Sequence, residues 1–237
     1  MRFLVTRPVE DAGKTASRLR ALGHQVFLEP LLTIQFYENV DLQCDGLQAL
    51  LATSANGVRA LMARPDAALW KDAPLFAVGV TTAALAREVG FVEVIEAQGD
   101  VSSLSALVRQ MCASGAGRLL HLSGVVSAGD LAGDLAQAGF QVEKAVLYEA
   151  VAAPSLSDVI VDALRAGEID GVLLYSPRSA EIFVDLVKKA GLADICASLE
   201  AYCLSANAAR PLRSLGFKAL HIAERPNEEA LFGLIGP

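Results

Sequence analysis

The sequence lacks the features that mark several large classes of protein. No apolar run approaches the roughly 18 residues of a membrane-spanning helix, although 53% of the residues are hydrophobic. The first residues contain no apolar segment of the kind found in a secretion signal. Only 20% of the residues are charged, so the composition is not that of a disordered chain. These absences predict a folded cytoplasmic protein with no membrane partner.

Metal-binding and redox patterns are also missing. The four cysteines have no CxxC spacing, and the histidines are scattered; these residues are Cys44, Cys112, Cys196, Cys203, His24, His121 and His221. Without a secretion signal, we expect the cysteines to be reduced core thiols. We expect no metal site, because no ligands cluster in the sequence. The net charge of −7 argues against a general nucleic-acid-binding protein.

The common cofactor and nucleophile motifs are absent as well. The chain has no G-x-G-x-x-G after its first strand, no G-x-x-x-x-G-K-[ST] and no G-x-S-x-G. A receiver domain needs acidic residues at the end of its first strand, where this chain has Thr6-Arg7-Pro8. No nucleotide cofactor is therefore expected. We interpret Lys14, Arg18 and Arg20 as a solvated helix face and Trp70 as a packing residue.

Apolar strands and amphipathic helices alternate along the chain. Its 237 residues are enough for two domains of about 120 residues each. It opens with a strand over residues 2–6, a helix over 11–22 that Gly23 ends, and a strand over 25–28, which is a parallel βαβ pattern. Further strands are expected at 48–53, 75–78, 91–95, 118–122, 171–175, 201–204 and 219–222, and helices at 57–63, 81–89, 102–112, 129–138, 157–165, 178–190, 207–215 and 227–234. The fold class predicted is α/β, with parallel, flavodoxin-like sheets flanked by helices.

Several segments recur in the second half of the chain. The stretches 30–37 and 144–151 follow the similar phrases Leu-Gly-His-Gln-Val and Ala-Gly-Phe-Gln-Val, and a shift of 116 residues places Leu32 on Tyr148. Ser54 returns as Ser176 at a shift of 122 residues, and 77–83 returns as 203–209 at a shift of 126. The repeat predicts two similar domains that these two stretches join as crossing strands. Taken alone, it suggests a division near residue 115.

The turns that follow the predicted strands are rich in hydroxyl groups and glycine. In open parallel sheets, ligands bind where such turns enter helices, whose N-termini attract anions. The candidate binding residues in these turns are Arg7, Ser54, Thr81, Thr82, Ser123, Gly124, Ser176 and Asn207. For any single turn, simple N-capping is the better explanation. Their pairwise repetition favours a cleft lined by donors for a ligand with several carboxylates or phosphates.

Tyr148 lies in the second of the two crossing strands. A strand tyrosine can serve packing alone at a domain boundary. Its phenol can also donate a hydrogen bond or a proton. We expect Tyr148 to face the cleft between the two domains.

Four phrases, in order, make the chain resemble the uroporphyrinogen-III synthase family over essentially its whole length. They are Leu-Val-Thr-Arg-Pro (4–8), Leu-Ala-Thr-Ser-Ala-Asn-Gly-Val (51–58), Phe-Ala-Val-Gly-Val-Thr-Thr-Ala (76–83), and Ala-Gly-Phe-Gln-Val (138–142) leading to Leu-Tyr-Glu (147–149). The resemblance implies one domain made of residues 1–36 and 152–237 and another made of residues 37–151. It also implies cyclisation of the linear tetrapyrrole hydroxymethylbilane with inversion of ring D and loss of water, without cofactor or metal.

The resemblance also assigns roles to individual residues. Tyr148 matches the tyrosine that assists departure of the hydroxyl group, Thr82 a threonine of a Gly-x-x-Thr turn, and Ser54 and Ser176 the serines of paired turns. The chain departs from the family where Ala208 replaces a threonine, for which Asn207 could substitute, and where arginines are missing from residues 122–128. As partners we expect a polycarboxylate substrate and a transient contact with the preceding deaminase, and we expect a monomer. The alternatives are a non-catalytic two-domain protein that binds an anionic metabolite, or a degenerate paralogue that binds tetrapyrroles for regulation.

Overall fold

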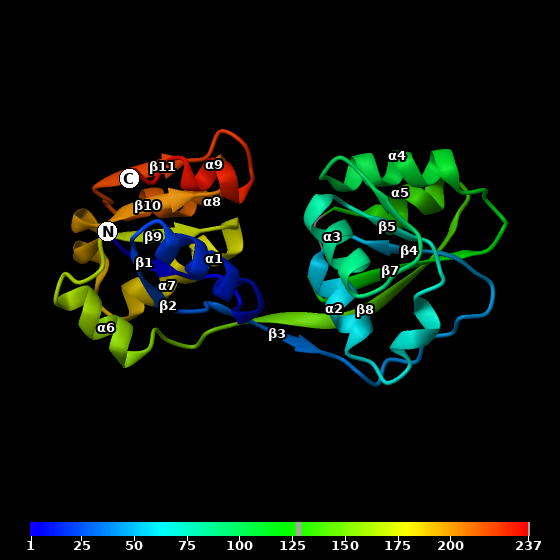
Figure 1. Ribbon diagram of the computed structural model, residues 1–237, viewed down its shortest axis with the longest axis horizontal. Coiled ribbons are helices and arrows are strands. Elements are labelled where there is room, and N and C mark those ends of the chain that lie inside the picture. Colours follow the sequence, from blue (N-terminus) through cyan, green and yellow to red (C-terminus); the bar gives the residue numbers. More distant parts are fainter. Residues whose placement is uncertain (127–128, 237) are drawn as a thin grey trace. The chain divides into compact units, whose positions relative to one another are not determined.

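The computed structural model of the protein describes residues 1–126 and 129–236. The chain divides into two compact units, of which unit 1 is Met1–Thr33 with Val151–Pro237 and unit 2 is Ile34–Ala150. Each unit is a β-sheet covered by helices (Figure 1). The chain passes between the units twice, in β3 (Leu32–Phe36) and in β8 (Gln141–Ala152).

Unit 1 is built on a five-stranded sheet in which the strand order is β2-β1-β9-β10-β11. Every neighbouring pair in it is parallel. The strands are β1 (Arg2–Val5), β2 (Gln25–Leu28), β9 (Gly171–Leu174), β10 (Glu200–Cys203) and β11 (Ala219–Ile222). The central strand β9 is buried at every residue, whereas the outer strand β2 is not. Burial on both faces explains why the central strands are continuous apolar runs.

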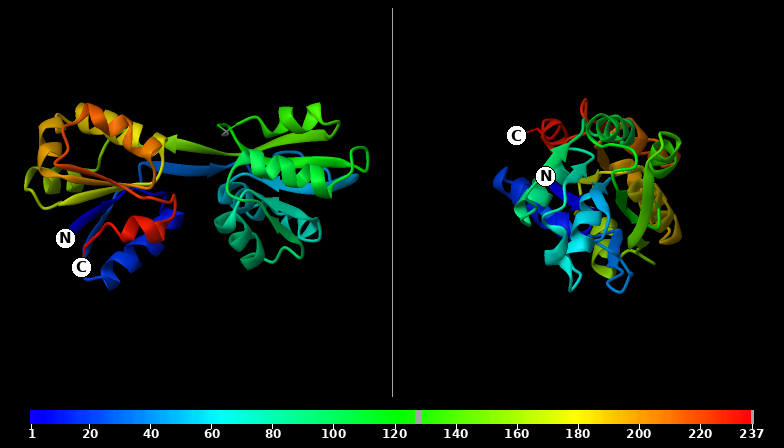
Figure 2. Two further views of the ribbon diagram at one scale, coloured as in Figure 1. Left: turned by 90° about the horizontal axis from the view of Figure 1, so that it is seen from above. Right: turned by 90° about the vertical axis from the view of Figure 1, so that its right-hand side faces the viewer.

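Helices cover both faces of the sheet in unit 1 (Figure 2). Residues of α1 (Val9–Ala21) and α9 (Glu228–Phe232) share one apolar core with β1. The other core contains residues of α6 (Asp158–Arg165), α7 (Pro177–Lys189) and α8 (Ala206–Ala209). Two 3₁₀ helices complete the unit, η2 (Ala193–Ser198) and η3 (Pro211–Ser214).

Unit 2 repeats this layered plan. Its sheet has the order β3-β8-β7-β4-β5-β6, and the pairs from β8 to β6 are parallel. The further elements of this unit are β4 (Leu47–Ala52), α2 (Ala55–Met62), η1 (Ala67–Trp70), β5 (Leu75–Ala77), α3 (Val80–Glu88), β6 (Val94–Glu96), α4 (Val101–Met111), β7 (Arg118–Gly124) and α5 (Leu131–Gln137). Trp70 is fully buried in the core beside α2 and α3, which confirms its expected packing role.

The two connecting strands β3 and β8 are neighbours and run antiparallel. The amide of Ala153 donates to the carbonyl of Leu31 at one end, and the amide of Tyr37 donates to the carbonyl of Leu147 at the other. The residue numbers of both pairs add up to the same value, which is the mark of antiparallel pairing. Residues 30–37 and 144–151 thus belong to one pair of crossing strands, as the sequence predicted.

The two sheets share the same order of parallel strands in space, but the chain begins each sheet at a different strand. The order β2-β1-β9-β10-β11 in unit 1 corresponds to β8-β7-β4-β5-β6 in unit 2. In this correspondence β9 matches β4, so that Ser176 and Ser54 follow equivalent strands. The predicted α/β class, with two similar parallel sheets flanked by helices, is therefore confirmed.

Some local expectations were wrong. The helix expected over residues 207–215 is broken into α8 and η3, because Pro211 has no N–H to continue the hydrogen bonding. The strand expected over 91–95 begins only at Val94. Cys44 is exposed and Cys112 half-buried, so only Cys196 and Cys203 are core thiols.

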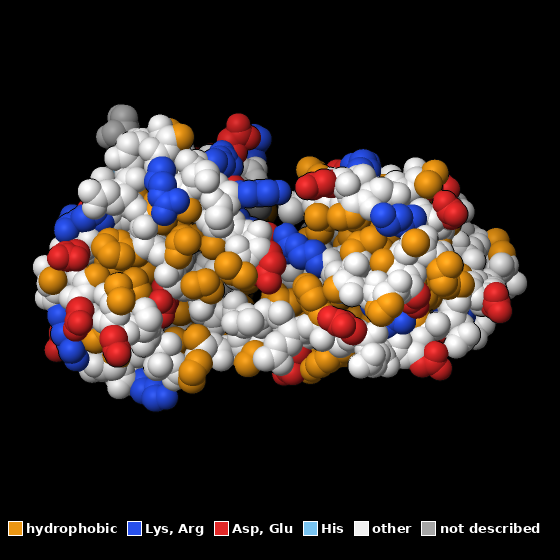
Figure 3. Space-filling view, turned by 60° about the horizontal axis from the view of Figure 1, so that its bottom comes forward, with side chains coloured by type: hydrophobic (Ala, Val, Ile, Leu, Met, Phe, Trp, Pro, Cys, Tyr) orange, Lys and Arg blue, Asp and Glu red, His pale blue; other side chains and the backbone are white. Residues whose placement is uncertain are grey.

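Charged side chains of both signs are dispersed over the face of the molecule that Figure 3 shows. In the space-filling view, Lys and Arg side chains alternate with Asp and Glu and with apolar groups on the visible face of each unit (Figure 3). No extended basic patch gathers on the part of the described surface that is drawn there. This distribution does not favour a nucleic-acid-binding surface.

Candidate functional site

In each sheet, successive strands along the chain are first added on one side of the first parallel strand and later on its other side. The boundary between the two sides is the switch point of the sheet. In unit 1 this switch point lies between β1 and β9, and in unit 2 between β7 and β4. Turns at the carboxyl ends of the two strands at such a point frame the usual ligand crevice of an open parallel sheet. Arg7 and Ser176 lie in these turns in unit 1 and Ser54 does so in unit 2, whereas Gly124, predicted to lie in a turn, is the last residue of β7. These are four of the predicted binding residues.

The turn from β4 into α2 is tightly built. Ser54 is the N-cap of α2, and its hydroxyl accepts a hydrogen bond of 3.2 Å from the amide of Asn56. A Cβ atom on Gly57 would lie 2.7 Å from the carbonyl oxygen of Leu122, so only glycine lets α2 approach the end of β7 this closely. The Ser54 side chain is therefore a cap, and the first turn of the helix lies directly at the switch point of unit 2.

The half-buried Thr53 and the buried His121 form a polar pair beside this turn. The Thr53 hydroxyl and His121 Nε2 are 3.1 Å apart. His121 Nδ1 is buried and has no partner in the part of the chain that the structure describes. Burial, followed by the charge of Lys144 opposite it on β8, lowers the pKa of His121 to about 4. The imidazole is thus neutral at pH 7.

The turn from β5 into α3 contains the two predicted threonines. Gly79 is the N-cap of α3, and a Cβ on it would lie 3.1 Å from Cα of Gly99. Thr81 is exposed at the start of the helix, whereas Thr82 is 5% exposed. The Thr81 hydroxyl is accessible to a ligand in this unit, and the Thr82 hydroxyl is nearly covered.

Tyr148 lies on β8 against Gly124, where the pairing of β7 and β8 shifts register. Ser123 is paired with Val146 and Gly124 with Tyr148, so β8 has one extra residue at this point. A Cβ atom on Gly124 would lie 2.7 Å from Cε2 and 2.8 Å from Cζ of the Tyr148 ring. Gly124 thus leaves the space that the ring occupies. Ser123 is fully buried, and its hydroxyl donates to the Gly124 carbonyl at 2.9 Å.

The phenol of Tyr148 differs from those of the other three tyrosines. Tyr37, Tyr175 and Tyr202 each donate to a glutamate carboxylate, at 2.8, 3.1 and 3.0 Å. The Tyr148 ring is 9% exposed, and within residues 1–126 and 129–236 its hydroxyl has no hydrogen-bond partner. A nearly buried phenol usually has a partner. The Tyr148 hydroxyl is therefore a donor that no described residue uses.

In unit 1, the predicted residues differ in whether their side chains are exposed and in whether they already have hydrogen-bond partners. Ser176 caps α7, accepting from the amide of Ser179 at 3.1 Å. Asn207 is exposed in the first turn of α8, which Ser205 caps. Ala208, which the resemblance places at the position of a threonine, is fully buried, and its amide donates to the Ser205 hydroxyl at 3.3 Å.

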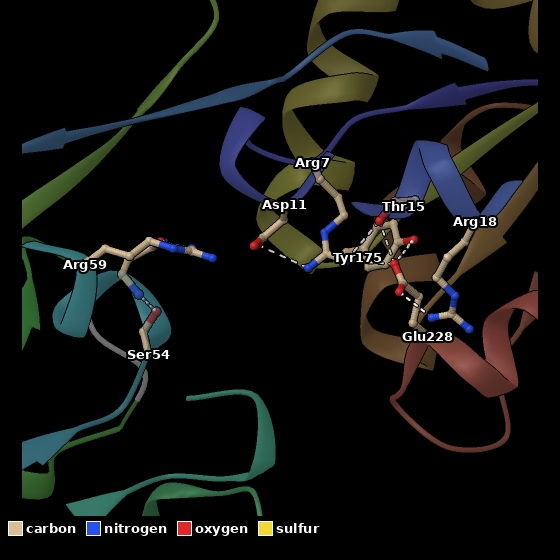
Figure 4. Close-up of polar contacts among 9 residues, drawn as sticks. Arg7, Asp11, Thr15, Arg18, Ser54, Arg59, Tyr175 and Glu228 are labelled. Atoms are coloured by element: carbon tan, nitrogen blue, oxygen red, sulfur yellow. Dashed lines mark hydrogen bonds and ion pairs between the residues drawn. The ribbon is translucent and has the colours of Figure 1, made fainter. Parts of the chain in front are cut away.

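Arg7 is held in a polar cluster that sequence reasoning did not find. Its guanidinium lies 2.9 Å from Glu228 and 3.2 Å from Asp11, and it stacks over the Tyr175 ring at 4.3 Å (Figure 4). Arg18, expected on a solvated face, also pairs with Glu228, at 2.7 Å. Glu228 is 221 residues from Arg7, and no pattern in the sequence links the two.

The described residues contain neither a metal-binding cluster nor a membrane-spanning helix. No cluster of three or more His, Cys, Asp or Glu side chains is placed to hold a metal ion. Within the same residues, no helix has the length and apolar character needed to cross a membrane. Of the segment 122–128 that departs from the family, Ser127 and Ala128 lie outside the described residues.

Comparison with known proteins gives a consistent result. The family model described as uroporphyrinogen-III synthase HemD matches residues 13–233. A uroporphyrinogen-III synthetase structure from Helicobacter pylori superimposes with a TM-score of 0.69 at 18% identity, covering 99% of this chain and 98% of that one. A mutant uroporphyrinogen III synthase from Thermus thermophilus gives 0.58 at 19% identity, with 99% and 97% covered. Among curated protein sequences, none matches the chain. The two structures establish the likeness of fold.

The buried His121 gives a prediction for the dependence of stability on pH. Its pKa is lower in the folded state, about 4, than in the unfolded state, about 6.5. Between these values the unfolded chain binds a proton that the folded chain does not, so the free energy of unfolding falls as the pH falls through this window. For His121→Gln, we expect the loss between pH 7 and pH 5 to be smaller than in the wild type by about 2 kcal/mol.

Urea denaturation of both proteins at several pH values between 7 and 5 measures this difference. The two profiles should diverge towards lower pH, whatever constant offset the substitution adds. Parallel profiles would show that His121 titrates normally in the folded protein.

Proposed function

This chain belongs to the uroporphyrinogen-III synthase family, and from that premise we propose that it closes hydroxymethylbilane into uroporphyrinogen III in tetrapyrrole (haem) biosynthesis. The reaction inverts ring D and releases water, so the protein is a lyase. The single observation that carries the proposal is the family match over residues 13–233, nearly the whole chain. No observation favours the non-catalytic binding protein.

The substrate of this reaction is a chain of four pyrrole rings with eight carboxylates. We propose that the carboxyl edges of both sheets receive it, one in residues 1–36 with 152–237 and the other in residues 37–151. The amides at the helix N-termini near Ser54 and Ser176 suit carboxylates, because the helix dipole favours negative charge there. The exposed side chains of Thr81 and Asn207 add donors. Thr82 contributes mainly by shaping the start of α3, and Ser123 and Gly124 by shaping the end of β7.

Tyr148 is the residue that we propose to act on the reacting centre. Loss of the substrate hydroxyl group requires a proton or a hydrogen bond at the departing oxygen, and a phenol can supply either. Its position supports this role, because its hydroxyl has no partner in the described part of the chain while its ring is fixed against Gly124. The remaining task is orientation, which brings the substituted carbon of ring D to the site of closure.

We also propose the setting in which the protein works. It is a cytoplasmic monomer, and it takes its substrate from the preceding deaminase during a transient contact. The basis is the family, whose linear substrate closes without enzyme to the wrong isomer. Rapid transfer between the two enzymes would limit that side reaction.

An isomer assay tests the activity and the role of Tyr148. Hydroxymethylbilane is generated in situ from porphobilinogen, the product is oxidised, and the type I and type III porphyrins are separated. The wild type should give an excess of type III. Tyr148→Phe should lower kcat by roughly 10- to 100-fold with little change in KM, since it removes a donor used only in the reaction.

Tyr37→Phe is the matched control for this substitution. It makes the same chemical change directly after the neighbouring strand β3, but it removes a phenol that already donates to Glu149. Its kcat should stay near the wild-type value. Type I product alone from folded wild-type protein would overturn the proposed function, and equal effects of the two substitutions would overturn the role of Tyr148.

The contact of Gly124 with Tyr148 gives a second prediction. Gly124→Ala would place a methyl group within 2.8 Å of the ring, so the ring must move, at a cost of about 1–3 kcal/mol in stability. We expect kcat to fall, and to fall no further when the substitution is made in the Tyr148→Phe background. Gly13→Ala is the control, because a methyl group there meets nothing within 4 Å. Independent, additive losses would show that Gly124 does not act through Tyr148.

A further inference from the structure

Glu228 is the centre of a convergent set of donors in unit 1. Its Oε1 accepts hydrogen bonds from Thr15 at 2.6 Å, from Arg7 at 2.9 Å and from Tyr175 at 3.1 Å. Its Oε2 accepts from Arg18 at 2.7 Å. The donors come from the turn after β1, from α1 and from the end of β9, while Glu228 comes from α9. Figure 4 shows these side chains pointing at a single carboxylate.

The cluster lies at the switch point of the unit 1 sheet. Arg7 follows the end of β1, and Tyr175 follows the end of β9, directly before Ser176. In open parallel sheets, ligands bind at this position, outside the carboxyl ends of the strands. The donor set therefore occupies the place at which the proposed function requires recognition of carboxylates.

The chemistry of the donors is that of a carboxylate receptor. Two guanidinium groups and two hydroxyl groups can satisfy both oxygens of one carboxylate, and charge-assisted hydrogen bonds are the stronger kind. Burial alone raises the pKa of Glu228, but the hydrogen bond from Thr15 and the charge of Arg7 outweigh it, so the pKa is lowered. The ionised carboxylate is thus the form that the cluster holds.

The charges of the cluster balance only while Glu228 is in place. Arg7 and Arg18 carry two positive charges, and Glu228 and Asp11 carry two negative ones. Without the Glu228 carboxylate the cluster has a net positive charge and four unfilled donors. Such a cluster attracts an anion of the same shape.

Glu228 is placed where its side chain can leave the cluster. It is the first residue of the five-residue helix α9, and residues 224–227 before it are exposed. The helix itself is anchored further along by Leu231 and Phe232. A change of side-chain rotamer moves the carboxylate without disturbing that anchor.

We propose that this cluster is a carboxylate subsite, that Glu228 fills it in the substrate-free protein, and that one substrate carboxylate displaces Glu228 onto the surface. The proposal rests on the proposed function and deepens it. One carboxylate replaces another, so the half-buried guanidinium of Arg7 and the exposed one of Arg18 keep an acidic partner before and after the exchange. The exchange makes occupation of the subsite depend on a correctly placed acidic side chain of the substrate.

Binding of uroporphyrin I, an octacarboxylate macrocycle that is not a substrate, tests the exchange by fluorescence titration. Glu228→Gln weakens the internal competitor, and we expect the probe to bind roughly three- to tenfold more tightly. Glu229→Gln is the matched control: it makes the same change in net charge on the next residue, which is exposed and outside the cluster. It should leave the affinity near that of the wild type. Adding Arg7→Gln to Glu228→Gln should abolish the gain.

The proposal would be overturned if Glu228→Gln did not bind the probe more tightly than the control. If Glu228 only fastens α9 to α1, Glu228→Gln will bind the probe as Glu229→Gln does, or more weakly. Should Glu228→Gln fail to fold, Glu228→Asp provides the test, because the shorter side chain keeps the charge but cannot reach both arginines; a gain in affinity is again expected. The isomer assay of the wild type decides the proposed function separately, since probe binding does not depend on turnover.

Discussion

Parallel strand pairing is the constraint on which the rest of this structure depends. Because all strands of a parallel sheet end at the same edge, the turns into the helices collect there. In both units the strand order reverses once, between β1 and β9 and between β7 and β4. Residues far apart in the chain, such as Arg7 and Ser176, are thus placed at one edge. A protein without nucleotide or nucleophile motifs can in this way present many donors to an anionic substrate.

The two edges contribute different chemistry to the proposed reaction. In unit 1, Arg7 and Arg18 are neutralised by Glu228 and Asp11, so this edge is an occupied carboxylate site. In unit 2, Tyr148 is fixed by Gly124 and its hydroxyl is unpartnered within the described residues. One edge therefore suits recognition and the other the departing hydroxyl group. Neither assignment needs a cofactor.

Much of the fold could be predicted from the sequence because its signals are local. Alternation of apolar strands with helices ended by Gly23 or Gly191 marked the βαβ units, and the repeat of Ser54 at Ser176 marked equivalent strands. Local signals could not reveal side-chain partners. Arg18 is exposed, as a solvated helix face requires, but the sequence did not show that it pairs with Glu228. The sequence counted Ser123 as a donor for a ligand, and its hydroxyl donates to the Gly124 carbonyl. Pro211 was a local signal that the prediction overlooked, and it splits the expected helix.

Hydrogen exchange of the backbone amides with and without bound uroporphyrin I tests the central claim, that the carboxyl edges of both sheets hold the substrate. The account predicts slower exchange in the first turns of α2, α3 and α7, and in the turn after β1, when the porphyrin is bound. The opposite edges, around Gln25, Arg118 and Glu200, should exchange at unchanged rates. Protection at those edges, or in one unit only, would contradict the account.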